Sequence, residues 1–117
     1  MHHNHGPMKD CIELCWKCRN ECQDTLFNNC LEEGGDHLEP EHVRLMADCI
    51  QICQASADFM TRHSPLHASI CAACADICEA CAKSCEKISG DHMKACAEVC
   101  RQCAKACRDM GQMKKAA

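Results

Sequence analysis

Cysteine, in place of large aliphatic residues, marks the positions of this chain that we expect to be buried. Fifteen of the sixteen cysteines recur at alternating spacings of three and four residues, a period that keeps them on one face of an α-helix. An amphipathic helix usually carries Leu, Ile or Val at these positions. The pattern therefore predicts helices whose inward faces are lined with thiols. The four rows are Cys11, Cys15, Cys18 and Cys22; Cys49 and Cys53; Cys71, Cys74, Cys78, Cys81 and Cys85; and Cys96, Cys100, Cys103 and Cys107.

Turn and capping residues divide these rows into four predicted helices. Pro7 favours a helix start, and Gly34-Gly35 ends that first helix. Pro40, the Ser64-Pro65 pair and Gly90-Asp91 mark the starts of the other three. We expect helices over about 8–33, 40–62, 65–88 and 91–110. The short connections make neighbouring helices antiparallel, which predicts an all-α, up-down-up-down four-helix bundle with a cysteine-lined core.

The length of the chain fits one domain. Its 117 residues are too few for two domains with separate cores. We assign residues 8–113 to the bundle and expect a disordered, His-rich tail over residues 1–7 and a short C-terminal tail over 114–117. Large apolar side chains are scarce, with two Phe, one Trp and no Tyr. Because the conventional core is thin, the bundle needs further cohesion, which metal–sulfur bonds or disulfides usually provide.

Charge and hydropathy exclude several classes of partner. The net charge is −4, and acidic and basic residues are mixed, so no basic face is available to follow phosphates and we expect no nucleic-acid partner. No segment approaches the roughly 20 apolar residues of a membrane span, and the N-terminus lacks the apolar stretch of a signal peptide. We therefore expect a cytoplasmic protein with no membrane partner. Thiols are kept reduced in the cytoplasm, which favours metal binding over structural disulfides.

The choice of metal follows from charge and spacing. Thiolates select Cu(I), Zn(II) and iron–sulfur clusters. Four thiolates around each Zn(II) leave a net negative charge, and several such sites would bury several uncompensated charges. One Cu(I) per thiolate leaves the core neutral. Cysteines four residues apart lie about 6 Å apart along the helix axis, so their side chains can converge on one ion. We therefore expect multiple Cu(I) ions in a row along the bundle.

Other interpretations of the thiols stay open at this point. A zinc buffer would hold Zn(II) in separate sites, and an iron–sulfur or other redox electron-transfer protein is suggested by the Cys-x-x-Cys pairs. A disulfide framework fits poorly, because sulfurs one turn apart on a continuous helix do not match disulfide geometry. No acid/base group stands apart from the cysteine rows, so we do not expect an enzyme.

Methionine and histidine residues gather at both ends of the predicted bundle. We assign them as a metal entrance, because thioether and imidazole groups hold Cu(I) more weakly than thiolates and suit residues that pass ions inward. The alternative is that the methionines are flexible core filler and the histidines are solvated. Cys30, which we also assign as a metal ligand, lies near the second end but is out of phase with its helix. The entrance residues are Met8, Met60, His67 and Met110 at one end, and Met46, His92 and Met93 at the other.

Several cysteine motifs are shared with a known family. They are Cys11-Ile12-Glu13, Cys30-Leu31-Glu32-Glu33, the run from Ile70 to Cys81, and Ala95-Cys96-Ala97 through Cys107. With these motifs the chain resembles the bacterial copper storage proteins over nearly its whole length, and the cytosolic branch in particular. The first helix departs from the family, which tends to continue its cysteines where Thr25 and Asn29 stand.

The resemblance carries expectations about function. It implies a four-helix bundle whose inward cysteines hold many Cu(I) ions, without catalysis and typically as a homotetramer. We expect such a protein to protect the cell from copper or to keep copper in reserve.

Overall fold

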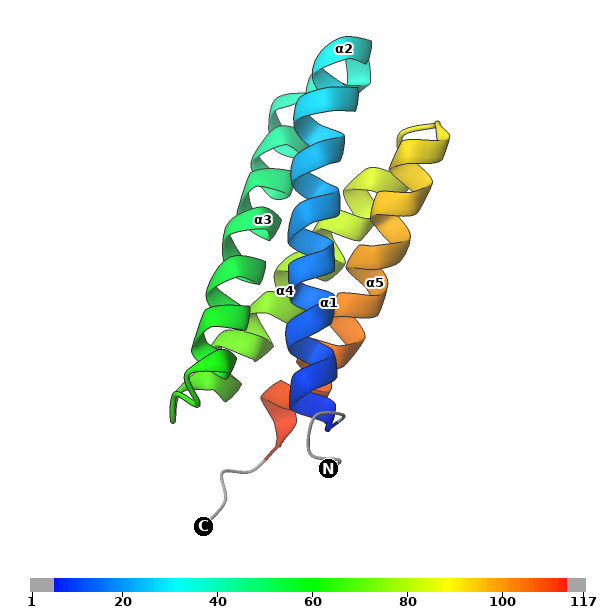
Figure 1. Cartoon of the computed structure of the whole chain (residues 1–117). Helices are drawn as coiled ribbons and strands as arrows, with labels where there is room; N and C mark the ends of the chain where they lie inside the picture. The colour runs from blue at the N-terminus through cyan, green and yellow to red at the C-terminus, as the bar shows by residue number, and fades with distance from the viewer. Residues whose placement is uncertain (1–5, 114–117) are drawn as a thin grey trace.

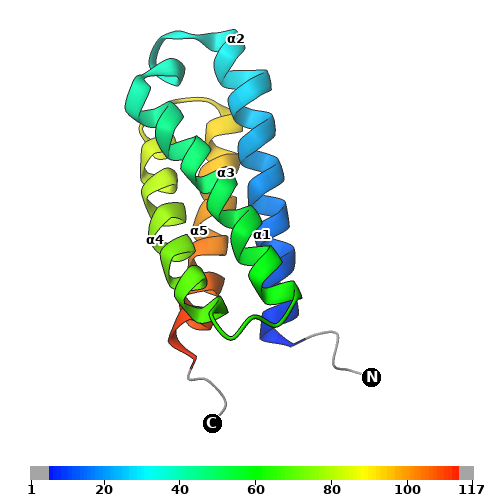
Figure 2. The same ribbon diagram turned by 90° about the vertical axis from the view of Figure 1, so that its left-hand side faces the viewer.

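Four antiparallel rods of helix pack into one bundle in the computed structural model, which describes residues 6–113 (Figures 1 and 2). The first rod contacts the second and the fourth, and the third contacts the same two. This arrangement confirms the prediction of an up-down-up-down four-helix bundle. The first rod is α1 (Pro7–Asp24), the π-helical turn η2 (Thr25–Cys30) and α2 (Leu31–Glu33); the others are α3 (Pro40–Thr61), α4 (His67–Glu86) and α5 (Asp91–Gln112).

The chain reverses direction at short connections with recognisable turn chemistry. Gly34 and Gly35 follow α2 with φ angles of 69° and 54°, a region that glycine adopts without strain. The short helix η3 (Gly35–Leu38) then leads into α3, where the Glu39 carboxylate accepts a hydrogen bond from the His42 N–H at 3.0 Å. Helix α4 begins at His67, slightly after Pro65, because the Ser64 hydroxyl accepts from the Leu66 N–H and holds this segment as a turn.

The π-helical turn changes which side chains the first rod directs inward. A regular α-helix turns about 100° per residue, so from Cys22 it would place Asn29 inward and Cys30 about 80° away. The π-helical turn holds one more residue per turn than an α-helix. Cys30 is consequently fully buried, whereas Asn29 is only partly buried. The phase mismatch of Cys30 in the sequence therefore reflects a local change of helical period.

Sulfur fills most of the interior of the bundle. All sixteen cysteines have 0% relative exposure, and so do Met46, Met60 and Met93. Small residues allow α4 and α5 to approach closely: a Cβ placed on Gly111 would lie 2.9 Å from the Cα of Ala72. At the surface, the same two helices are joined by Arg101 and Glu86 in a bidentate ion pair with N···O distances of 2.8 and 3.0 Å. The predicted cysteine-lined core is thus confirmed.

Helix α1 starts, and helix α5 ends, at the end of the bundle opposite to α2 (Figure 1). Helix α1 starts at Pro7 with Gly6 at its N-cap. The expected tails fall mainly on residues 1–5 and 114–117, which lie outside the described residues. Over residues 6–113, no helix combines the length and the apolar character that a bilayer span requires.

Candidate metal centre

The cysteine side chains of facing helices meet in one connected row along the bundle axis. Three groups of four sulfur atoms have all their members within 4.8 Å of one another. Neighbouring groups share a member: Cys103 belongs to the first and second, and Cys18 to the second and third. The row is therefore continuous through these ten thiols. The groups are Cys15, Cys74, Cys103 and Cys107; Cys18, Cys53, Cys78 and Cys103; and Cys18, Cys22, Cys49 and Cys100.

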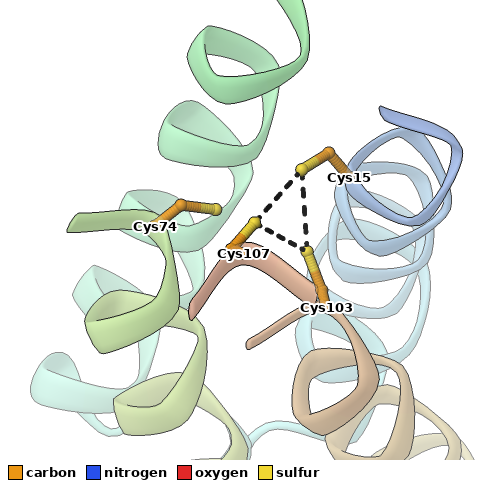
Figure 3. A group of neighbouring side chains, drawn as sticks. All are labelled: Cys15, Cys74, Cys103 and Cys107. Carbon is orange, nitrogen blue, oxygen red and sulfur yellow. Dashed lines mark hydrogen bonds between the residues drawn. The ribbon is translucent and has the colours of Figure 1, made fainter. Parts of the chain in front are cut away.

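The first group joins three helices (Figure 3). Its Cys107 Sγ lies 3.5 Å from Cys15 Sγ on α1 and 3.9 Å from Cys103 Sγ one turn away on α5, and Cys103 lies 3.8 Å from Cys15. Cys74 approaches from α4. Metal–thiolate bonds are about 2.3 Å long. Two sulfurs at these separations can therefore bind one ion between them without movement of the backbone.

In the middle of the bundle all four rods contribute. Cys18 of α1 lies 3.8 Å from Cys49 of α3 and 3.7 Å from Cys100 of α5, while Cys49 lies 3.7 Å from Cys78 of α4. Cys22 is 3.5 Å from Cys100. A metal ion bound at this level would therefore link all four rods to one another.

Thiols beyond the three groups extend the row in both directions. Cys11 lies 3.6 Å from Cys107, and Cys96 lies 3.5 Å from Cys22. All sixteen cysteines are free thiols. The sulfur separations are far longer than the 2.05 Å of a disulfide. The remaining members, each fully buried, are Cys30, Cys71, Cys81 and Cys85.

Proton sharing controls the charge of this row. Hydrogen bonds to Cys103 and other thiols, together with burial, raise the pKa of both Cys53 and Cys78 and keep these thiols neutral. Cys15 receives hydrogen bonds from Cys103 and Cys107, which lower its pKa to about 6. Some thiols of the row thus keep their protons, whereas others, such as Cys15, ionise more readily. Metal ions that bind thiolates must displace the protons that remain.

The residues that we assigned as a metal entrance occupy different environments. Four methionines are buried in the interior, and Met8 packs partly buried against it. His67 is partly buried, with Nδ1 2.9 Å from the Ser64 carbonyl oxygen, whereas His92 is exposed at the surface. The structure therefore places four of the methionines in the interior and leaves His92 exposed at the surface. The four buried methionines are Met46, Met60, Met93 and Met110.

His42 is a potential ligand that our assignment of site residues left out. It is only 2% exposed, and its Nε2 lies 3.9 Å from Cys30 Sγ. Its Nδ1 is 2.7 Å from the Ser84 hydroxyl, and burial lowers its pKa, which favours the neutral imidazole. The sequence did hold a signal, because His42 stands in helical phase with Met46 and Cys49 on the inward face of α3.

Comparisons with solved structures give the same fold, in two cases with bound copper. The Nmul_A1745 protein from Nitrosospira multiformis is 46% identical, with a TM-score of 0.87 over 90% of this chain and 94% of that chain. The Cu(I)-bound copper storage protein BsCsp3 is 40% identical, with a TM-score of 0.84 over 91% and 99%. A cytosolic copper storage protein from Streptomyces lividans, in a structure with five coppers, is 29% identical, with a TM-score of 0.80 over 93% and 95%.

A family model agrees with these similarities. The model described as "Csp: Copper storage protein" matches residues 4–112, nearly the whole chain. The match confirms the resemblance drawn from the cysteine motifs. The chain therefore belongs to the copper storage protein family.

Proposed function

We propose that this protein binds many Cu(I) ions per chain along its row of buried thiols and stores or sequesters them. One observation carries the proposal: the three four-thiol groups overlap through Cys18 and Cys103. Separate sites would each need their own ligands, whereas shared thiolates can bridge successive ions. The copper held by related structures supports the identity of the metal.

Charge favours Cu(I) over zinc in this interior. Ten thiols divided among Zn(II) sites would leave a net negative charge on each full site, in a region that water does not reach. One Cu(I) for each thiolate cancels the charge completely. No titratable cation lies within the three groups to compensate for excess thiolate charge, since all their members are cysteines.

We expect no catalytic function from this row. Every thiol is fully buried, so a substrate larger than an ion has no access to a nucleophilic sulfur. Storage needs the opposite properties, namely many equivalent ligands and protection from water and oxidants.

We further propose that the protein is cytoplasmic and forms a homotetramer. The Streptomyces lividans relative is described as cytosolic, which supports the location. Apolar side chains on the first rod support an oligomer, because Trp16, Phe27 and Leu31 are 40%, 54% and 54% exposed. Light scattering on the full chain should then give about four times the 13.0 kDa mass of one chain. A monomer at micromolar concentration would contradict the tetramer and leave copper storage untouched.

An anaerobic titration of the reduced protein with Cu(I), in competition with a chromophoric Cu(I) chelator, tests the storage proposal. We expect tight uptake that approaches one ion for each of the sixteen cysteines. A parallel titration with Zn(II) is the matched control. Saturation at two or three ions, or tighter binding of Zn(II), would refute the proposal.

A further inference from the structure

A buried serine on α3 stands at a position where the helical period of the thiol row would allow a cysteine. Buried residues of α3 recur at alternating spacings of four and three, and Ser56 follows Cys49 and Cys53 in this series. Ser56 has 0% relative exposure, like the two cysteines before it. Helix α3 therefore presents a hydroxyl to the row at this level instead of a thiol. The full series is His42, Met46, Cys49, Cys53, Ser56 and Met60.

The Ser56 hydroxyl contacts sulfur atoms of two other helices. Its Oγ lies 3.4 Å from Cys71 Sγ on α4 and 3.9 Å from Cys107 Sγ on α5. A hydroxyl has one proton and two lone pairs, so in the metal-free row Ser56 can donate to Cys71 and accept from the Cys107 thiol. Cys107 also belongs to the first four-thiol group. Ser56 thus lies where the end of the row near the start of α4 joins that group.

Binding of Cu(I) changes what this hydroxyl does. A thiol loses its proton when it binds the metal, so the Cys107 sulfur can no longer donate, and the sulfurs of both cysteines become stronger acceptors. Hydrogen bonds with an ionised partner are roughly twice as strong as those between neutral groups. Cu(I) selects soft sulfur donors, so the hard oxygen of Ser56 stays free of metal and keeps its proton. The hydroxyl therefore stabilises the loaded row more than the empty row.

We infer that Ser56 is a positioning residue that strengthens Cu(I) binding at this end of the row, by donating a hydrogen bond from its hydroxyl to the metal-bound sulfur of Cys71. The inference rests on the proposed function, since it assumes that Cu(I) fills the row. Loss of a group that hydrogen-bonds to a metal ligand typically lowers metal affinity about 10- to 100-fold. Ser56 and Cys71 are fully buried, so solvent does not replace the hydroxyl when it is removed.

Substitutions at Ser56 separate the hydrogen bond from packing. Ser56→Ala removes the hydroxyl. Ser56→Thr and Ser56→Val have nearly the same shape as each other, but only threonine keeps a hydroxyl. Ser69→Ala, at an exposed serine of α4, is the control outside the row. Circular dichroism and thermal unfolding of the metal-free variants check that they fold equally well.

Competition between the full-length, reduced protein and a chromophoric Cu(I) chelator, under anaerobic conditions, measures the effect. We expect Ser56→Ala and Ser56→Val to lose about tenfold in affinity for the ions held by Cys71 and Cys107, with the total number of ions unchanged when no competitor is present. Ser56→Thr and Ser69→Ala should keep most of the original affinity.

A double-mutant cycle tests whether Ser56 acts through Cys71. In a Cys71→Ala background, Ser56→Ala should cost much less affinity than it does in the unmodified protein, because the nearest acceptor of the hydroxyl is gone. An equal cost in both backgrounds would show that the effect of Ser56 does not pass through Cys71, which would refute the inference.

The outcomes separate this inference from the proposed function. If Ser56→Ala binds all its ions as tightly as the unmodified protein, the role of Ser56 is refuted even when total uptake approaches one ion per thiol. If threonine weakens binding as much as valine does, packing is responsible, and the hydrogen bond is refuted as the cause. If the unmodified protein binds only a few ions, the storage proposal itself fails.

Discussion

Removing the two shared thiols gives the sharpest test of a continuous row. Cys18 and Cys103 each belong to two four-thiol groups, so the double variant Cys18→Ala, Cys103→Ala leaves these groups with three, two and three thiols. The matched control, Cys71→Ala with Cys85→Ala, also removes two buried thiols, but neither lies in any of the three groups found among the described residues. Both variants should therefore lose about two ions through charge balance alone.

Affinity distinguishes the two variants. The shared-thiol variant should weaken the binding of every ion held by the three groups. The control should weaken the binding only of ions at the two ends of the row. We expect at least a tenfold loss of affinity, about 1.4 kcal/mol, for more than two ions in the shared-thiol variant only. Each Cys→Ala change removes one buried heavy atom, which costs about 1 kcal/mol of stability in either variant.

Competition with a Cu(I) chelator under anaerobic conditions measures both effects in one titration. Circular dichroism and thermal unfolding of the metal-free proteins show whether the two variants fold equally well. If the shared-thiol variant and its control lose the same number of ions and keep the same affinity for the rest, the thiols act independently and the continuous row is refuted.

Three further predictions follow from individual residues. Gly111→Ala should destabilise the bundle by about 1 to 3 kcal/mol in thermal unfolding, because the new Cβ would meet the backbone of Ala72 at 2.9 Å. Gly6→Ala meets nothing within 4 Å and should cost less, only the loss of a glycine N-cap. Burial lowers the pKa of His42, so below about pH 6.5 the unfolded chain binds a proton that the folded metal-free chain does not. The free energy of unfolding should therefore decrease as the pH falls, by up to about 1.4 kcal/mol per pH unit from this group, and a His42→Gln variant with an unchanged pH profile would contradict this cause. Hydrogen bonding and burial raise the pKa of Cys78, whereas hydrogen bonds lower that of Cys15, so Cu(I) loading near neutral pH should release protons, but fewer than one per ion. A pH-stat titration measures this release, and loading without proton release would show that the row is already ionised.

The spacing of the cysteines predicted both the helices and the interior because one period determines both. In a four-helix bundle the inward face of each rod is the buried face, so residues three and four apart share it. This rule holds for the fifteen cysteines in phase. It failed for Cys30, because the rule assumes a uniform α-helix and the π-helical turn at Thr25–Cys30 shifts the phase by one residue.

The histidines were harder to place from the sequence. His92 stands next to Met93, and adjacent residues on a helix point about 100° apart, so only one of the two can face the interior. Met93 is buried and His92 is exposed. His42 shares the inward phase of α3, but its approach to Cys30 depends on the π-helical turn of another rod and on Ser84 of a third. Contacts of this kind follow from packing and could not be read from local periodicity.

Anomalous diffraction at the copper absorption edge, on crystals of the Cu(I)-loaded protein, tests the central claim most directly. A continuous row predicts a line of copper peaks along the bundle axis, in which ions next to Cys18 and Cys103 share these thiolates with a neighbouring ion. A few isolated peaks, each surrounded by its own four sulfurs, or copper bound mainly at the surface, would contradict the account.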